Sequence, residues 1–556
     1  MSNYSLLIKN ARIVDGSGAP AFLGSVAIQG DRIAAVGAVD ARGDIEIDAG
    51  GKVVAPGFID IHTHYDPQLC WDRLASPSPE HGVTSLVMGN CSISLAPVKP
   101  QDTQRLIHLF GSVEDMEGRL LEETVPFAWE SFADYIEYLK QGLGPNVGVF
   151  VGHSVLRLYV MGAASQQRIA TDEEIHAMCE VLRGALRAGA FGISYTFNHF
   201  DELGQPLPCV YADRREKLAL MQVMAEEGRG MVEVAPNFID KGAAMANYDE
   251  FGALALETGV TCTLSPLLQS PNLTNKWDEM LERLEYWQQQ GAPLFAQTQT
   301  RPLDMTVQLS KGSAALSKMT TWRQLMDLPI DERTAAFADA ARRPVLNSEM
   351  AAMKGVNNLI GACVVKRSRA AQNQALTGQR VRDIAEASHR SVADTLLDIA
   401  VADGLDTEFS LDGYIHGDVD IVAKLLSHPG MHIGSADAGA HITQFAGAGD
   451  TCYLFEKFVR QEKRMTLEHA VKRLTSDLAS GWKIADRGLL QAGKFADVVI
   501  FDPDTIARGA EEWVDDVPGG SGRYVRHPSG IDKVIVNGQV LVDQGKYTAA
   551  QPGRII

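Results

Sequence analysis

Apolar and polar positions follow one pattern at the two ends of this chain and another in the middle. Near the start, short apolar runs separated by turn pairs such as Gly30-Asp31 predict β-strands at 5–8, 11–14, 25–29 and 32–36. The same pattern of short apolar runs is found again at 497–501 and 533–542. In the second of these ranges, Asn537-Gly538 is a strong hairpin signal. These similar ends predict one small β-sandwich domain built from residues 1–56 and 486–556.

The middle of the chain alternates apolar strands with helical segments such as 172–188, 214–227 and 277–290. Eight strand candidates lead into polar or glycine-rich ends: 58–64, 84–91, 147–153, 192–196, 230–234, 260–265, 293–298 and 431–435. Eight such repeats predict an α/β fold, a (β/α)8 barrel over residues 57–485. The last connection is far longer than one crossover needs, so we expect an inserted lid subdomain within 301–379.

Composition narrows the class of protein. With 556 residues and 45% hydrophobic content, the chain can bury a large core in more than one domain. A net charge of -19 argues against nucleic acid or an anionic membrane as a partner, and the N-terminal residues lack a signal-peptide pattern. Seven scattered cysteines do not form a disulfide framework. We therefore expect a cytoplasmic enzyme with a small-molecule substrate and of unspecified oligomeric state.

His62-Thr63-His64 ends the first predicted barrel strand. Side chains two residues apart project from the same face of a strand, so the two imidazoles can bind one ion, although such pairs also occur as ordinary histidines. Asp437 lies just past the eighth strand, and a closed barrel would bring it to the same mouth. Beside a metal-activated water, Asp437 could accept a proton and return it to a departing nitrogen.

Further candidates follow other strands. Cys91 ends the second strand and is either a small buried hydrophobe or a thiolate ligand. Two imidazoles with a carboxylate or thiolate suit zinc and leave a position open for water. Polar residues near strand ends are candidates for substrate binding, with a structural or surface role as the alternative for each: His153, Arg157, His199, His441 and Arg301.

Four motifs together resemble a known family. They are Gly57-Phe-Ile-Asp-Ile-His-Thr-His-Tyr-Asp66, Gly82-Val-Thr-Ser-Leu-Val-Met-Gly-Asn-Cys-Ser92, Gly152-His-Ser-Val-Leu-Arg157 and Ile433-Gly-Ser-Ala-Asp437. The sequence is similar to the N-acyl-D-amino-acid deacylases (D-aminoacylases) of the amidohydrolase superfamily over nearly its whole length. The resemblance implies a metal-dependent hydrolase that cleaves an amide, with His62, His64 and Cys91 as ligands and Asp437 as the proton-transfer residue and a further ligand.

The chain also departs from that family. The deacylases take zinc ligands from histidines on the fifth and sixth strands, whereas this chain has no histidine between His199 and His389. We favour one zinc ion over two. Two alternatives remain: Glu233 or His441 replaces a missing ligand, or the barrel is catalytically inactive and acts as a binding protein. The substrate could equally be another amide, a carbamate, a lactam or an ester.

Overall fold

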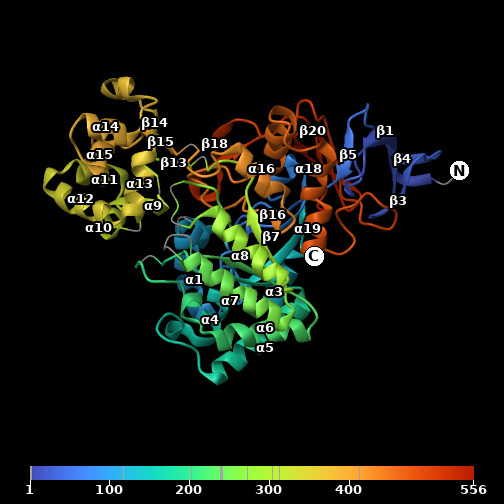
Figure 1. The fold of residues 1–556 in the computed structure, drawn as a ribbon, viewed down its shortest axis with the longest axis horizontal. Helices are drawn as coiled ribbons and strands as arrows, with labels where there is room; N and C mark the ends of the chain where they lie inside the picture. Colours follow the sequence, from blue (N-terminus) through green and yellow to red (C-terminus); the bar gives the residue numbers. More distant parts are fainter. Residues whose placement is uncertain are drawn as a thin grey trace.

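The protein is elongated, with three regions arranged along its longest axis (Figure 1). The computed structural model describes residues 3–114, 116, 118–201, 203–237, 242–271, 273, 275–303, 305–311, 313–317, 319–411 and 413–556. A helical insertion, coloured yellow, lies at one end, the blue N-terminal strands lie at the other, and the barrel lies between them.

The central region is a parallel barrel, as predicted. Its strands are β6 (Phe58–Asp60), β7 (Val83–Met88), β8 (Asn146–Gly152), β9 (Gly192–Thr196), β10 (Met231–Ala235), β11 (Cys262–Leu264), β12 (Leu294–Thr298) and β16 (Met431–Ile433). They pair in the order β16-β12-β11-β10-β9-β8-β7-β6, and a bridge between Thr63 and Ala438 joins the two ends. All residues of β7 and β8 are buried, because a parallel barrel is covered on both faces, and such strands read as continuous apolar runs.

Helices cover the outside of the barrel. They include α4 (His153–Met161), α5 (Asp172–Ala188), α6 (Arg214–Glu226), α7 (Ala243–Thr258), α8 (Trp277–Gln289), α16 (Val419–Ser427) and α18 (Leu467–Leu474). Helix α5 shows why its bounds were readable from sequence. A capping box between Thr171 and Glu174 starts it, Gly189 in the left-handed conformation ends it, and its apolar stripe is buried. Between β7 and β8 lie α1 (Thr103–Glu114), α2 (Gly118–Thr124) and α3 (Phe132–Leu139).

Both ends of the chain contribute to one nine-stranded sheet. Its members are β1 (Asn3–Ile13), β2 (Phe22–Gln29), β3 (Arg32–Gly37), β4 (Arg42–Asp48), β5 (Val53–Pro56), β17 (Val498–Phe501), β20 (Ile531–Val536), β21 (Gln539–Asp543) and β22 (Lys546–Tyr547). The two strands expected at 5–8 and 11–14 are a single strand, β1, whose register shifts between Ile8 and Ala11. Asn10 is in the left-handed region there, so the break in the apolar pattern is a bulge and not a turn.

The insertion follows β12 and has its own hydrophobic core. It comprises β13 (Met305–Val307), α9 (Ala314–Ser317), α10 (Thr320–Met326), α11 (Ile330–Ala338), α12 (Arg343–Ala352), α13 (Lys354–Ala362), β14 (Val364–Arg367), α14 (Val381–Ala387), α15 (Val392–Ala402) and β15 (Glu408–Leu411). It continues beyond the expected limit at residue 379, because β15 pairs with both β13 and β14. Its core also takes in Phe445, from the segment that follows Asp437.

A hairpin of β18 (Glu511–Val517) and β19 (Ser521–Arg526) leaves the small sheet and contacts the insertion. The ring of Trp513 lies 3.3 Å from Lys311 Nζ, measured to the ring centroid, and Tyr524 lies 4.8 Å away. On its other side, the Tyr524 amide donates to the Ile442 carbonyl (2.8 Å). Within the described ranges, no helix combines the length and apolar character that crossing a membrane requires.

Candidate metal centre

His62 and His64 lie in the segment that follows strand β6. Thr63, between them, donates from its amide (3.0 Å) and from its hydroxyl (2.9 Å) to the carbonyl of Val87 on β7, which fixes this segment against its neighbour. Both imidazoles are buried, and their ring centroids are 5.2 Å apart. The two rings therefore lie on one side, as expected, although the strand itself ends at Asp60 and not at His64.

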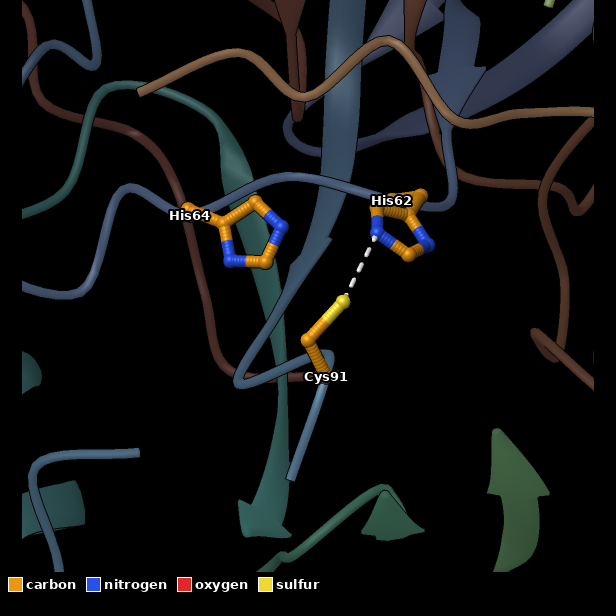
Figure 2. A group of neighbouring side chains, drawn as sticks. All are labelled: His62, His64 and Cys91. Atoms are coloured by element: carbon orange, nitrogen blue, oxygen red, sulfur yellow. Dashed lines mark hydrogen bonds between the residues drawn. The ribbon is translucent and has the colours of Figure 1, made fainter. Parts of the chain in front are cut away.

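Cys91 follows strand β7 and points toward the two imidazoles, as Figure 2 shows. Its Sγ lies 3.7 Å from His62 Nε2, and ligand atoms of His62, His64 and Cys91 all lie within 4.8 Å of one another. Cys91 and Ser92 both have positive φ, so the chain turns sharply at this point. This turn brings the thiol into the cluster.

Asp437 follows the last barrel strand and is distant from the two histidines along the sequence. Its Oδ1 atom is 3.3 Å from His62 Nε2 and 3.7 Å from His64 Nε2, and its amide donates to the His62 carbonyl at 3.2 Å. Two ligands that are each about 2.1 Å from a tetrahedral zinc ion lie about 3.4 Å apart. The spacing of these atoms therefore suits ligands of one ion. The Asp437 side chain remains 33% exposed, so it is also accessible from the open side.

The electrostatics of the cluster favour a cation. Burial lowers the pKa of His62 to about 4. Burial also opposes protonation of His64, but the nearby Glu114 carboxylate and the hydrogen bond to Asp437 outweigh it and raise the His64 pKa above its ordinary value. Partial burial opposes ionisation of Asp437, yet its hydrogen bond with His64 and the charges of both imidazoles hold the Asp437 pKa below its ordinary value.

Glu233 is a second buried carboxylate next to the histidine and cysteine cluster. Its side chain, from β10, is fully buried, and its Oε2 accepts a hydrogen bond from the Cys91 amide (3.1 Å). Its Oε1 accepts no hydrogen bond from the described residues and lies 3.8 Å from His62 Nδ1. Burial raises the pKa of Glu233 to about 8 and also raises that of the Cys91 thiol. A divalent cation would compensate these groups and hold the thiolate form of Cys91, so the residues present fit a metal.

Two residues that contact the histidines were not identified from the sequence. Glu114, the last residue of α1, places Oε1 at 2.9 Å from His64 Nδ1, and Ser265, just after β11, has its Oγ at 3.0 Å from His62 Nδ1. The position of Ser265 at a strand end is a signal that could have identified it. Glu114 lies in a helix of the β7–β8 connection, and no local pattern distinguishes it from a surface glutamate.

His153 and Arg157 lie elsewhere. Both side chains are fully buried and bind the carboxylate of Glu216 on α6, with 2.7 Å between His153 Nε2 and Glu216 Oε1. Arg157 also donates to the carbonyls of Ser165 and Arg168. Both side chains therefore already have a buried partner in the barrel wall, and their expected contact with substrate stays a prediction.

Among the other expected substrate contacts, Arg301 is buried, whereas His199 and His441 are half-buried. The Arg301 side chain forms an ion pair with Asp450 at 3.0 Å and donates to the carbonyl of Ala436. It therefore holds the backbone next to Asp437 in place. His199 is half-buried and its Nδ1 lies 2.6 Å from Thr196 Oγ1. His441 is also half-buried, and its charge contributes to the low pKa of Asp437. His199 and His441 thus keep partly accessible side chains, and His441 lies close to the cluster.

The barrel with its histidine, cysteine and aspartate cluster defines a class of metal-dependent hydrolases of C–N bonds. The model of the amidohydrolase family matches residues 46–542. This chain belongs to the amidohydrolase family.

Individual relatives confirm the more specific resemblance found in the sequence. A D-aminoacylase of Alcaligenes xylosoxydans xylosoxydans is 28% identical, with 100% of this chain and 97% of that protein covered. An N-acyl-D-aspartate deacylase of the same organism is 27% identical, covering 99% of this chain and 94% of the relative. Among solved structures, the N-acyl-D-glutamate deacylase of Bordetella bronchiseptica, complexed with zinc and a phosphonate inhibitor, is similar with a TM-score of 0.69, 25% identity, and 100% and 99% of the two chains covered.

Proposed function

We propose that this protein hydrolyses the amide bond of N-acyl-D-amino acids at a site holding one zinc ion. The proposed ligands are His62, His64 and Cys91, with Asp437 as a further ligand that would release the ion when it takes up a proton and so leave a position for water. The observation that carries the proposal is the approach of one Asp437 oxygen to Nε2 of both imidazoles, at 3.3 and 3.7 Å, on a side chain that is still accessible. The chemistry of the relatives supplies the reaction type and the substrate class.

In the proposed mechanism Asp437 transfers the proton. A zinc ion at this position would polarise the amide carbonyl and make the attacking water more acidic. The low pKa of Asp437 keeps its carboxylate ionised at neutral pH, so Asp437 can accept a proton from the attacking water. The protonated Asp437 then donates this proton to the leaving amine nitrogen, and the two product molecules depart.

The insertion is proposed to select the substrate. Phe445 lies only a few residues after Asp437 and packs in the core of the insertion, so the two regions are in direct contact. We therefore assign the acyl or side-chain end of the substrate to this side, with His199 and His441 as candidate contacts. We also propose a cytoplasmic location, since all seven cysteines are free.

Elemental analysis and an activity panel test the proposal. The purified protein should contain about one zinc ion per chain, because this chain has no histidine between His199 and His389 and therefore none on β10 or β11 to hold a second ion. Removing the metal with a chelator should abolish hydrolysis of a panel of N-acyl D-amino acids, and zinc should restore it. Two tightly bound ions per chain would contradict the ligand set. A protein that binds none after zinc supplementation would be an inactive barrel.

A further inference from the structure

In each imidazole, the ring nitrogen that faces away from Asp437 contacts a specific side chain. Both rings direct Nε2 toward Asp437 Oδ1, so Nδ1 is the outer nitrogen of each ring. The outer nitrogen of His64 lies 2.9 Å from Glu114 Oε1, an ion-pair contact without an aligned hydrogen bond, and the outer nitrogen of His62 is hydrogen-bonded to Ser265 Oγ at 3.0 Å. An acceptor at Nδ1 retains the hydrogen there and leaves the Nε2 lone pair available for a metal.

Each of these partners is also bound to the segment that carries Asp437. Ser265 Oγ lies 2.6 Å from the hydroxyl of Ser435, two residues before Asp437. The backbone carbonyl of Glu114 accepts a hydrogen bond from the amide of His441 (2.9 Å), four residues after Asp437. Glu114 and Ser265 therefore each connect one imidazole to one flank of the Asp437 segment.

That segment needs external support. Ser435, Asp437 and His441 have φ values of 64°, 55° and 49°, a left-handed conformation that costs non-glycine residues free energy. Such a conformation persists only where surrounding contacts determine it. The Ser435 hydroxyl and the His441 amide are two of the groups through which these contacts are made.

We propose that Glu114 and Ser265 are positioning residues that lock the two imidazoles and the Asp437 carboxylate into one preassembled ligand set. The inference rests on the proposed function, since it assumes that His62, His64 and Asp437 bind the same zinc ion. Ser265 is the main partner of His62, because Glu233 Oε1 is 3.8 Å from the same nitrogen, beyond hydrogen-bonding distance. A serine hydroxyl can accept from His62 and donate to Ser435 at once.

Zinc affinity of the full-length protein tests this assignment. Competition with a chromogenic chelator should show roughly 10- to 100-fold weaker zinc binding in Glu114→Ala and in Ser265→Ala, the usual effect of losing an outer partner of a ligating histidine. Glu114→Gln and Ser265→Thr keep an oxygen at each position and should recover most of the affinity. They also provide folded proteins if the alanine variants fail to fold. With cobalt in place of zinc, the visible bands should change in the alanine variants and return in the conservative ones.

Two matched controls separate positioning from general stability. Glu216→Ala removes another buried carboxylate that binds a histidine, and Ser368→Ala removes another buried hydroxyl, which donates to Asp403 at 2.9 Å in the insertion. Neither should alter zinc affinity, even if the melting temperature falls. Wild-type affinity in both Glu114→Ala and Ser265→Ala, or equal losses in the controls, would overturn the inference. A wild-type protein that binds no zinc would instead refute the proposed function.

Discussion

Asp437 is an accessible carboxylate held between two buried imidazoles. Its low pKa suits a group that must be ionised before water attacks and that carries a proton only during the reaction. We expect Asp437→Asn to fold normally, to retain most of its zinc, and to lower kcat by roughly a hundredfold to ten-thousandfold, the range for a lost general acid and base. Steady-state kinetics with parallel elemental analysis measure both quantities.

The comparison variant for Asp437 is Asp403→Asn. Asp403 also has a pKa below its ordinary value, but it accepts from Ser368 and Thr407 in the insertion, so kcat should not change. If Asp437→Asn loses its zinc, the residue is chiefly a ligand. If this variant keeps full activity, Asp437 does not transfer the proton.

At the scale of elements, the β18–β19 hairpin joins the insertion to the segment after Asp437. Lys311 of the insertion stacks on Trp513, while Glu511 accepts from the amide of Ala446 at 3.2 Å. Trp513→Ala removes a cation–π contact worth about 0.5–1 kcal/mol, so it should loosen the insertion and raise KM roughly twofold to fivefold with zinc content unchanged. Kinetics across N-acyl D- and L-amino acids would also reveal a broader substrate range.

A second cation–π pair provides the control for this element. Trp277→Ala removes the contact with Lys424 on the outside of the barrel, 5.3 Å from ring centroid to Nζ, and should leave KM unaltered. Unchanged KM values in Trp513→Ala for every substrate would show that the hairpin does not couple the insertion to the site. In that case the insertion does not select the substrate through this contact.

At the scale of the whole molecule, a buried polar network joins the small sheet, the barrel and the C-terminal segment. Asp497, next to β17, pairs with Arg487 and accepts from Asn146 of β8 (3.2 Å) and from the amide of Asn537 (2.8 Å). Asn537 in turn donates to the carbonyl of Pro552 at 2.7 Å. Asp497→Ala leaves the Arg487 charge buried without its partner, so we expect a loss of about 3–5 kcal/mol in stability and a clearly lower Tm.

Calorimetry and zinc analysis together assess that expectation. The carboxylate lies among the strand starts and not at the metal cluster, so zinc content should stay the same in Asp497→Ala. Asp497→Asn, which keeps the hydrogen-bonding oxygen but not the charge, should be intermediate. An unaltered Tm in both variants would mean that the network does not stabilise the junction.

Much of this fold could be predicted from local pattern. Strands such as β7 and β8 are buried on both sides and read as apolar runs, and α5 carries its own start and stop signals. His62, His64, Cys91 and Asp437 could be chosen as candidates because active-site residues in a barrel follow the strand ends, and their roles at the site stay a prediction. These features depend on short stretches of sequence, so the sequence alone determines them.

Other features were decided only by the tertiary structure. The apolar run from Val53 to Ile61 is continuous, but β5 pairs in the small sheet and β6 in the barrel, and the chain passes between them at Gly57, where a Cβ atom would lie 2.1 Å from Thr84 Oγ1. The ion pairs of Glu114 with His64 and of Arg157 with Glu216 each join residues on different helices or segments. The spacing of hydrophobic residues along the chain shows which face of a helix or strand is buried. The partner of a buried polar side chain, in contrast, depends on which distant segments lie side by side once the barrel has closed.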